Sequence, residues 1–272
     1  MKKIEKERLD SLLVIRGFFA TREKAKRAIM AGEILVEGEK INKVGQKVKI
    51  DCNISILKRD FDYVSRGGEK LEKALKVFNI VAKGKKVIDV GASTGGFTDC
   101  LLRFGADKVY CVDVGYGQLA WKLQKDHRVV VMDRTNIRYI TTDKFNTLFD
   151  LATIDVSFIS LDKVLPVVYN ILKKEGEVVA LIKPQFEAGR ELIQKGGLVQ
   201  KPEIHKMVIS KVIDISQRLG FKVIGITFSP LKGASGNIEY LIYLIKNLKA
   251  EFSTNLSYLT NEIVERAHQE LS

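Results

Sequence analysis

A glycine-rich stretch between Lys86 and Leu102, KVIDVGASTGGFTDCLL, has the order of residues expected at a ligand site. Its apolar run Val87–Val90 predicts a short buried strand, and a helical pattern resumes at about Thr98. A strand that leads through a glycine-rich turn into a helix brings backbone N–H groups and a helix N-terminus close to a ligand. The stretch therefore predicts a site in which the backbone itself contacts a bound molecule.

The spacing of the glycines narrows the class of ligand. A phosphate-binding P-loop has Lys and then Ser or Thr after its last glycine, whereas Phe97 follows Gly96 here. The dinucleotide pattern G-x-G-x-x-G also fails, because three residues separate Gly91 from Gly95. Asp113 ends the next predicted strand, where a carboxylate can accept hydrogen bonds from both ribose hydroxyls of a nucleoside. The motif favours a nucleoside ligand, and an ordinary strand–turn–helix without a ligand is the alternative.

Four charged residues, Lys70, Asp155, Lys183 and Glu239, lie at the ends of predicted elements. Lys70 is in the first turn of a helix expected from Glu69, where a lysine opposes the helix dipole and invites a functional explanation. The other three lie at strand ends, and ligands of parallel sheets bind outside the carboxyl ends of the strands. Each residue alone is more often structural. Together they form a set that we call the tetrad.

The elements that must position the tetrad alternate from Lys85 onward, which predicts a mostly parallel α/β sheet covered on both faces. The predicted strands are Val87–Val90, Val109–Val114, Val129–Met132, Leu151–Ile154, Val178–Ile182, Val223–Phe228 and Tyr240–Ile245. The predicted helices are Thr98–Arg103, Gln118–Gln124, Leu161–Leu172, Ile204–Leu219 and the C-terminal Leu256–Leu271. The segment SPLKGASGN is too short for a crossover helix, so the seventh strand is expected to run antiparallel.

Half of the chain's net charge of +12 lies in residues 1–60, which hold 15 Lys and Arg against 9 Asp and Glu. This concentration implies a polyanionic partner. The pattern predicts helices over Lys6–Arg16 and Thr21–Gly32, and then short β pieces around a turn at Gly38. Arg22 and Lys26 stand four apart and share one helix face. Phosphate contacts from such a face provide affinity and positioning rather than base readout.

Two stretches resemble known families. The pattern RLD-x8-F-x-TREKAKRAI-x-AG-x-ILVEG, within residues 7–57, resembles the S-four-like RNA-binding module, although Glu37 stands where that family usually has Asn. This departure bears on a local RNA contact more than on the fold. The pattern D-x-G-x-S-x-G-G-F, from Asp89 to Phe97, resembles the first motif of the RNA-methylating S-adenosylmethionine-dependent methyltransferases.

The tetrad resembles the K-D-K-E set of the FtsJ-type 2′-O-ribose methyltransferases in chain order and strand context. Combined with the S-four-like N-terminus and the junction Y-V-S-R-G-G-x-K-L at Tyr63–Leu71, the whole chain resembles the TlyA family, also labelled haemolysin A. The resemblance implies a Rossmann-like, seven-stranded methyltransferase sheet preceded by a small α+β RNA-binding domain. It also implies S-adenosylmethionine as cofactor and methylation of a cytidine 2′-hydroxyl in 23S, and in some members 16S, ribosomal RNA.

The resemblance also assigns residues. Catalysis falls to Lys70, Asp155, Lys183 and Glu239. Cofactor contacts are expected from Asp89, Gly91, Ser93, Gly95, Gly96, Phe97, Asp113, Asp133 and Asp155. RNA contacts are expected from Arg8, Arg22, Lys24, Lys26, Arg27 and Arg66.

A ribose hydroxyl is a weak nucleophile, so a base must take its proton. A lysine can do this in its neutral form, which burial and a second nearby cation favour. We therefore assign Lys183 as the base and Lys70 as its cationic partner. Asp155 and Glu239 orient the two lysines, with Asp155 nearest the methyl donor, and no metal is required.

The composition also bears on which other classes of protein are possible. No run approaches the roughly 20 apolar residues of a membrane span, and no secretory signal is visible, which favours a cytoplasmic protein. Three scattered cysteines and three distant histidines argue against a structural metal. A non-enzymatic RNA-binding or ribosome-assembly factor and a membrane-active haemolysin remain alternative functions. A small-molecule methyltransferase would leave the basic N-terminal module unexplained.

We expect three parts along the chain: an RNA-binding domain at 1–60, a linker at 61–68 and a methyltransferase domain at 69–272. Ribosomal RNA or ribosomal subunits are the expected partners. The segment Pro184–Pro202 is long for a connection inside a domain and carries three glycines, which is typical of a mobile cover over a site.

Overall fold

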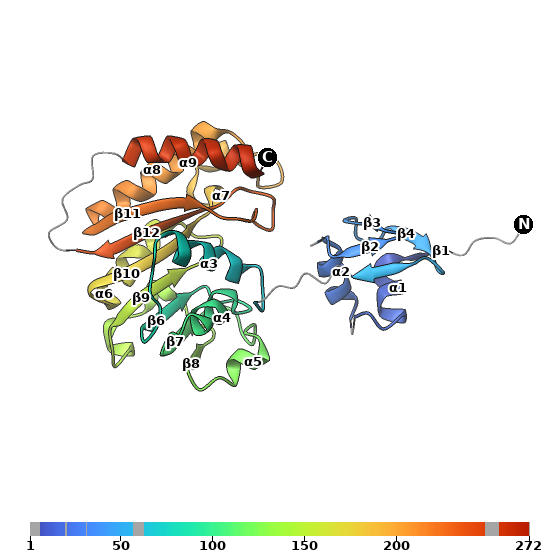
Figure 1. Cartoon of the computed structure of the whole chain (residues 1–272), viewed down its shortest axis with the longest axis horizontal. Coiled ribbons are helices and arrows are strands. Elements are labelled where there is room, and N and C mark those ends of the chain that lie inside the picture. Colours follow the sequence, from blue (N-terminus) through green and yellow to red (C-terminus); the bar gives the residue numbers. More distant parts are fainter. Residues whose placement is uncertain (1–5, 20, 31, 57–62, 248–255, 272) are drawn as a thin grey trace, which may run out of the picture. The chain divides into compact units, whose positions relative to one another are not determined.

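The chain divides into two compact units, residues 1–61 and 62–272 (Figure 1). The computed structural model describes residues 6–19, 21–30, 32–56, 63–247 and 256–271. Each unit is described by itself below.

The N-terminal unit packs two helices against small antiparallel sheets. Its elements are β1 (Lys6–Arg8), α1 (Leu9–Ile15), α2 (Arg22–Met30), β2 (Ile34–Val36), β3 (Glu39–Lys40), β4 (Lys47–Lys49) and β5 (Ile54–Ile56). Strands β1 and β4 pair with each other, and β2 lies between β3 and β5. The prediction that the first helix begins at Lys6 is wrong, because residues 6–8 pair with β4 and the helix begins at Leu9.

Apolar residues of both helices and of β2, β4 and β5 form this unit's core, including the fully buried Leu9, Leu13 and Ile29. A two-residue turn joins β2 to β3, and Glu37 and Gly38 both have positive φ, +52° and +81°. Asn and Gly suit such a turn best. Glu37 keeps the turn in place by accepting a hydrogen bond from the backbone N–H of Asn53 (2.9 Å).

The second unit is built on a seven-stranded sheet with the strand order β11-β12-β10-β9-β6-β7-β8. Only β12 is antiparallel to its neighbours β10 and β11. The strands are β6 (Lys86–Val90), β7 (Lys108–Val112), β8 (Val129–Met132), β9 (Phe149–Ile154), β10 (Leu172–Ile182), β11 (Phe221–Phe228) and β12 (Tyr240–Lys246). The predicted sheet with a reversed seventh strand is confirmed.

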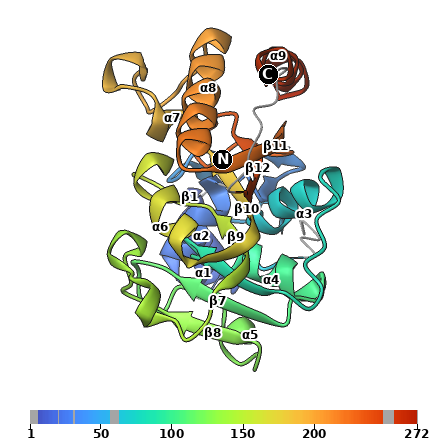
Figure 2. The ribbon, with the colours of Figure 1, turned by 90° about the vertical axis from the view of Figure 1, so that its left-hand side faces the viewer.

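Helices cover both faces of this sheet. Their bounds are α3 (Gly67–Val77), α4 (Gly96–Arg103), α5 (Trp121–Gln124), α6 (Leu165–Ile171), α7 (Pro184–Glu187), α8 (Pro202–Arg218) and α9 (Leu256–Leu271). One apolar core lies under α3, α4 and α5, and a second lies under α6, α8 and α9. Helix α9 lies beside α8, as Figure 2 shows. Because both faces are covered, the central strands read as continuous apolar runs.

Several element ends differ from the predictions. Helix α3 begins at Gly67 and α4 at Gly96, each two residues earlier than expected. The predicted helix over 161–172 is a 3-10 turn, Leu161–Lys163, followed by α6. Helix α6 has a proline at its start, which suits a first helical turn, and apolar periodicity gives no signal at the glycines that begin α3 and α4.

The segment Pro184–Pro202 contains α7, a 3-10 turn at Arg190–Leu192 and a bridge between Gln194 and Leu198. Its second half is fixed, because Asn237 donates from its side chain to the carbonyl of Gly197 and accepts from the N–H of Val199, both at 2.8 Å. The role of this segment as a mobile cover stays a prediction, which these bonds restrict to residues between α7 and Gly197.

Candidate active site

Two adjacent cavities open at the carboxyl ends of the strands, on either side of the turn after β6. One, of about 480 Å³, contains all four tetrad residues, and we call it the tetrad cavity. The other, of about 420 Å³, contains Asp113, and we call it the Asp113 cavity. They share a wall made by Gly91, Ser93, Asp155 and Ser157 together with Phe158. A ligand that extends across this wall would therefore reach both cavities.

The Asp113 cavity has the features of a nucleoside site. Both carboxylate oxygens of Asp113 accept backbone hydrogen bonds, from the N–H of Ser93 (2.8 Å) and of Gly115 (2.7 Å). These bonds fix the carboxylate and leave lone pairs for a pair of hydroxyls, since an ionised carboxylate has about four acceptor positions. Apolar side chains, among them Val112 and Ile137, line the same cavity and suit the faces of a base.

The turn after β6 brings the backbone close to both cavities. Gly91 has φ +84°, and a Cβ there would overlap the carbonyl oxygen of Asp155, so only glycine fits. Gly95, at φ +94°, precedes the first residue of α4. Gly96 and Phe97 begin that helix and line the tetrad cavity. The free N–H groups of this helix end are thus beside the cavity, as the glycine spacing indicated.

Asp89, Gly95 and Asp133 line neither cavity, so the cofactor contacts that the resemblance implied for them stay predictions. Asp89 is fully buried and accepts hydrogen bonds from the hydroxyls of Thr98 (2.6 Å) and Thr153 (2.9 Å). Burial raises its carboxyl pKa to about 6. Asp133 accepts from the N–H of Gly117 (2.8 Å). Asp89 therefore ties α4 to the sheet beneath the loop, and Asp133 holds the loop that follows β7.

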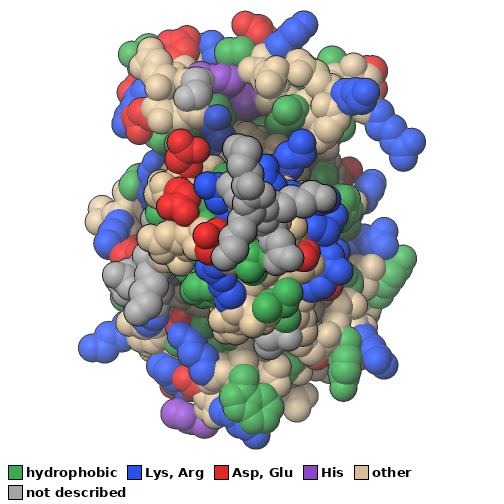
Figure 3. Space-filling view, turned by 90° about the vertical axis from the view of Figure 1, so that its right-hand side faces the viewer, with side chains coloured by type: hydrophobic (Ala, Val, Ile, Leu, Met, Phe, Trp, Pro, Cys, Tyr) green, Lys and Arg blue, Asp and Glu red, His purple; other side chains and the backbone are tan. Residues whose placement is uncertain are grey.

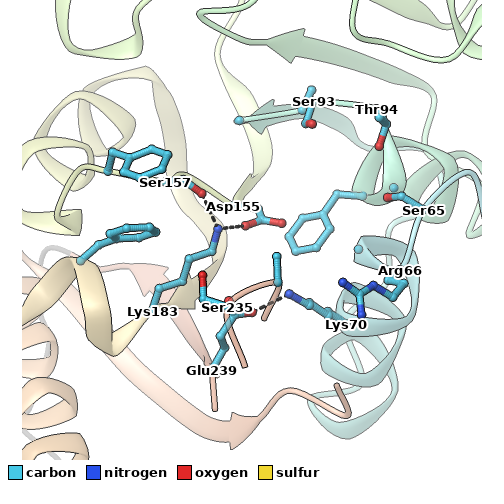
Figure 4. A pocket seen from close by; sticks show the side chains of 18 of the residues that line it. Ser65, Arg66, Lys70, Ser93, Thr94, Asp155, Ser157, Lys183, Ser235 and Glu239 are labelled. Atoms are coloured by element: carbon cyan, nitrogen blue, oxygen red, sulfur yellow. Dashed lines mark hydrogen bonds and ion pairs between the residues drawn. The ribbon is translucent and has the colours of Figure 1, made fainter. Parts of the chain in front are cut away.

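The tetrad cavity brings together Lys70 of α3 and three residues that adjoin strands: Asp155 follows β9, Lys183 follows β10 and Glu239 precedes β12 (Figure 4). Lys70 Nζ lies 2.5 Å from Glu239 Oε2, and Lys183 Nζ lies 2.6 Å from Asp155 Oδ1. Lys183 also donates to the hydroxyl of Ser157 (3.0 Å). The cavity thus contains two separate ion pairs, and the Glu239 side chain is only 3% exposed.

The junction before α3 positions Lys70. Leu71, the next residue, is fully buried and faces the sheet, which leaves Lys70 in the first turn beside the cavity. Gly68 packs against the ring of buried Tyr63, where a Cβ would overlap the ring. The N–H of Val64 donates to Asp99 of α4 (2.8 Å). This packing explains why the junction contains two glycines and an aromatic residue.

Sequence reasoning predicted Ser93 and Phe97 of the tetrad cavity but missed its other aromatic residues, Phe158 and Phe186, and the hydroxyl of Ser157. Phe158 is 91% exposed and has φ +64°, a conformation that bulky residues rarely adopt. Its ring lies 5.0 Å from that of Phe186 at the cavity wall. Exposed aromatic faces are suited to stack against unpaired bases. The apolar letters of VSFIS gave no such signal, because they read as strand or core.

The basic residues of the N-terminal unit divide into several groups. Arg8 and Arg22 both donate to the buried carboxylate of Asp10, at 3.0 and 2.7 Å. Burial opposes ionisation of Asp10, but the hydrogen bonds from Arg8 and Arg22 outweigh it and lower its pKa to about 2. Lys26 pairs with Glu23, and Lys24 is exposed.

The side chain of Arg27 lies outside the described residues, and Arg66 lines the tetrad cavity. Lys and Arg side chains are spread over the face shown in Figure 3, with acidic side chains among them.

The described residues contain neither a metal-binding cluster nor a membrane-spanning helix. No group of three or more His, Cys, Asp or Glu side chains in this part of the chain is arranged to hold a metal ion. No described helix is long and apolar enough to cross a membrane.

Comparison with protein families matches each unit separately. The FtsJ-like methyltransferase family matches residues 63–246, which is more than half of the chain. The S4 domain family matches residues 7–51.

Individual proteins are similar over most of the chain. YqxC of Bacillus subtilis, named as an rRNA methyltransferase, is 52% identical over 241 residues, 88% of this chain and 86% of that protein. The 16S/23S rRNA (cytidine-2′-O)-methyltransferase TlyA of Mycobacterium tuberculosis is 41% identical over 238 residues, 87% of this chain and 89% of that protein. A solved structure of a hemolysin-named protein from Streptococcus thermophilus matches with a TM-score of 0.79 and 46% identity, covering 98% of each chain. The chain therefore belongs to the TlyA family, in which an S4 domain precedes an FtsJ-like methyltransferase domain.

Proposed function

We propose that this enzyme transfers a methyl group from S-adenosylmethionine to the 2′-hydroxyl of a cytidine in ribosomal RNA. The observation that carries the proposal is the shared wall between the Asp113 cavity, which suits a nucleoside, and the cavity of the tetrad. The relative from Mycobacterium tuberculosis is named for this reaction on 16S and 23S RNA, which supports the same substrate class.

The cofactor fits the residues present. Asp113 would accept hydrogen bonds from the two ribose hydroxyls, and the apolar side of the Asp113 cavity would hold the adenine. Gly91 and Ser93 belong to both cavities, so the backbone between them would hold the part of the cofactor that joins its nucleoside to its methionine. When bound, S-adenosylmethionine supplies an electrophilic methyl group on a sulfonium sulfur.

The tetrad would act on the ribose hydroxyl. Lys183, once neutral, would take the hydroxyl proton on Nζ, and Asp155 and Ser157 would hold that nitrogen in position. Lys70, paired with Glu239, would supply a fixed positive charge on the other side of the cavity. Holding the two reactants in line contributes more to the rate than proton transfer does.

The S4 domain would anchor the RNA. The half-exposed side chains of Arg8 and Arg22 keep donors free for phosphate after their bonds to Asp10, and Lys24 of α2 is exposed as well. Such contacts increase affinity and fix orientation without reading sequence. Arg66, which lines the tetrad cavity, would contact the RNA next to the target.

The decisive experiment is to map 2′-O-methyl groups in ribosomal RNA from cells with and without the gene. We expect at least one cytidine to lose its methyl group when the gene is absent and to regain it when the wild-type gene returns. Loss of a base methyl group, or no loss in either subunit's RNA, contradicts the proposed reaction.

A second experiment tests the cofactor. Calorimetry should show binding of S-adenosylmethionine in the presence of EDTA, because the carboxylate and backbone groups described above need no metal. Binding that vanishes in EDTA and returns with a divalent ion would overturn this part of the proposal.

A further inference from the structure

Helix α7 carries two side chains into the tetrad cavity directly after Lys183. Gln185 and Phe186 both line this cavity, and neither lines the Asp113 cavity. The helix is only four residues long, so its position depends on anchoring by its neighbours. Residues on it lie close in sequence to the proposed base, and they face the space that a target nucleotide would enter.

Glu187 provides that anchoring. It is 5% exposed, and its carboxylate accepts from the hydroxyl of Ser160 (2.5 Å) and from the N–H of Leu161 (2.7 Å). Its carbonyl accepts from Lys211 of α8 (2.8 Å). The end of α7 is therefore held from two sides, and this fixes where the side chain of Gln185 begins.

The amide of Gln185, in contrast, is held by none of the described residues. Its Oε1 is buried, yet within the described part of the chain it has no hydrogen-bond partner, and the amide nitrogen donates to no described residue. The four charged tetrad residues in the same cavity are all paired. A buried amide oxygen without a partner costs free energy, so its presence indicates that another molecule supplies the missing partner.

The chemistry of an amide indicates which part of a nucleotide this would be. An amide is uncharged and presents a donor and an acceptor side by side, which matches the edge of a base rather than a phosphate. Cytosine offers an exocyclic amino donor beside the ring N3 acceptor. The aromatic pair of Phe158 and Phe186 lies on the same cavity wall, where a base would stack.

We propose that Gln185 recognises the base of the target nucleotide, with Oε1 accepting from the cytosine amino group and Nε2 donating to N3. This role rests on the proposed function and deepens it, because it makes Gln185 a specificity-determining residue of the same cavity. The cytosine amino group gives the buried Oε1 the partner that the protein does not.

The test compares two RNA substrates in two enzymes. The substrates are transcripts of the mapped rRNA segment, one with cytidine at the target and one with the pyrimidin-2-one ribonucleoside, which lacks only the amino group. Wild type should prefer the cytidine transcript by about 5- to 100-fold in kcat/KM, the range that one base contact provides. Gln185→Met, which has a similar shape without the amide, should lose this preference and give a ratio near one.

Two controls keep the comparison sharp. Gln217→Met makes the same substitution on α8, outside both cavities, and should retain the wild-type ratio. If turnover of the Gln185 variant is too slow to measure, the dissociation constants of the two transcripts, measured by fluorescence anisotropy in a Lys183→Ala background, give the same ratio.

The outcomes separate the two proposals. Equal preference for cytidine in wild type and in Gln185→Met overturns the role of Gln185, as does a Gln185→Met variant that no longer binds S-adenosylmethionine in calorimetry. Failure of wild type to methylate the cytidine transcript at all would instead count against the proposed function.

Discussion

The two units use positive charge in different ways. In the S4 domain, Arg8 and Arg22 share one buried carboxylate, that of Asp10, and their side chains remain about half exposed. In the tetrad cavity, Lys70 and Lys183 each have a carboxylate of their own, and both side chains are 11% exposed. The first arrangement leaves donors available to a large anion at the surface. The second confines two cations to one small space.

The exposure of these ion pairs determines how much each contributes to stability. An exposed ion pair is worth little to stability, whereas removing one partner of a buried pair leaves an uncompensated charge. Arginine suits the surface arrangement because its fork of donors can serve a carboxylate and a phosphate together, while lysine can give up its proton. We therefore expect substitutions of basic residues to have different effects in the two units.

The largest effect is expected at Lys183. Lys183→Ala should reduce single-turnover methyl transfer by about 10²–10⁴-fold, the usual contribution of a general base, with cofactor and RNA affinities within a few-fold of wild type. Lys183→Arg should fail similarly, because a guanidinium does not lose its proton. Near-normal transfer by Lys183→Arg would mean that charge alone is required, and an active Lys183→Ala would refute the tetrad assignment.

Lys70 should affect both stability and catalysis. Lys70→Met leaves Glu239 buried without its partner and should cost about 3–5 kcal/mol of unfolding free energy in denaturant titrations. The double variant Lys70→Met/Glu239→Leu removes both charges and should recover most of that stability but not methyl transfer. An active double variant would show that the pair is structural only.

A smaller effect is expected in the S4 domain. Arg22 and Lys24 are both basic residues of α2, so Lys24 serves as the control for Arg22. Arg22→Ala takes one donor from the buried Asp10 and should lower the stability of this domain, measured as faster hydrogen exchange of α1 and α2 amides in the full chain. Lys24→Ala should leave exchange unchanged. Both should weaken RNA binding and reduce its salt dependence. Equal exchange in the two variants would contradict the structural role of Arg22.

The smallest effect concerns pH. The Asp10 pKa falls from its ordinary value of 3.8 to about 2 in the folded domain. Its contribution to stability is therefore fully present above pH 4 to 5 and is lost as pH falls from about 4 towards 2. Asp10→Asn should be less stable than wild type at pH 6, and the difference should shrink as the pH is lowered to 2. If the difference in exchange protection between wild type and Asp10→Asn stays constant across this pH range, the pairing of Asp10 with the two arginines is refuted.

Much of the fold could be predicted because it depends on local patterns. Apolar runs gave the strands, and the short connection SPLKGASGN required β12 to run antiparallel. The C-terminal helix has the bounds that its spacing indicated. The strand at Lys6–Arg8 could not be predicted, because its partner β4 lies about 40 residues away and its charged letters carry no strand signal.

By itself the sequence determined the glycine loop, the order of the tetrad and the two-domain organisation, since each depends on residue type and spacing along the chain. Only the tertiary structure decided which lysine meets which carboxylate, that Asp89 points beneath the loop rather than into a cavity, and that Phe158 is exposed beside Phe186. Lys70 and Glu239 are 169 residues apart. Contacts across such distances depend on how helices and strands pack, and no local pattern in the chain contains that information.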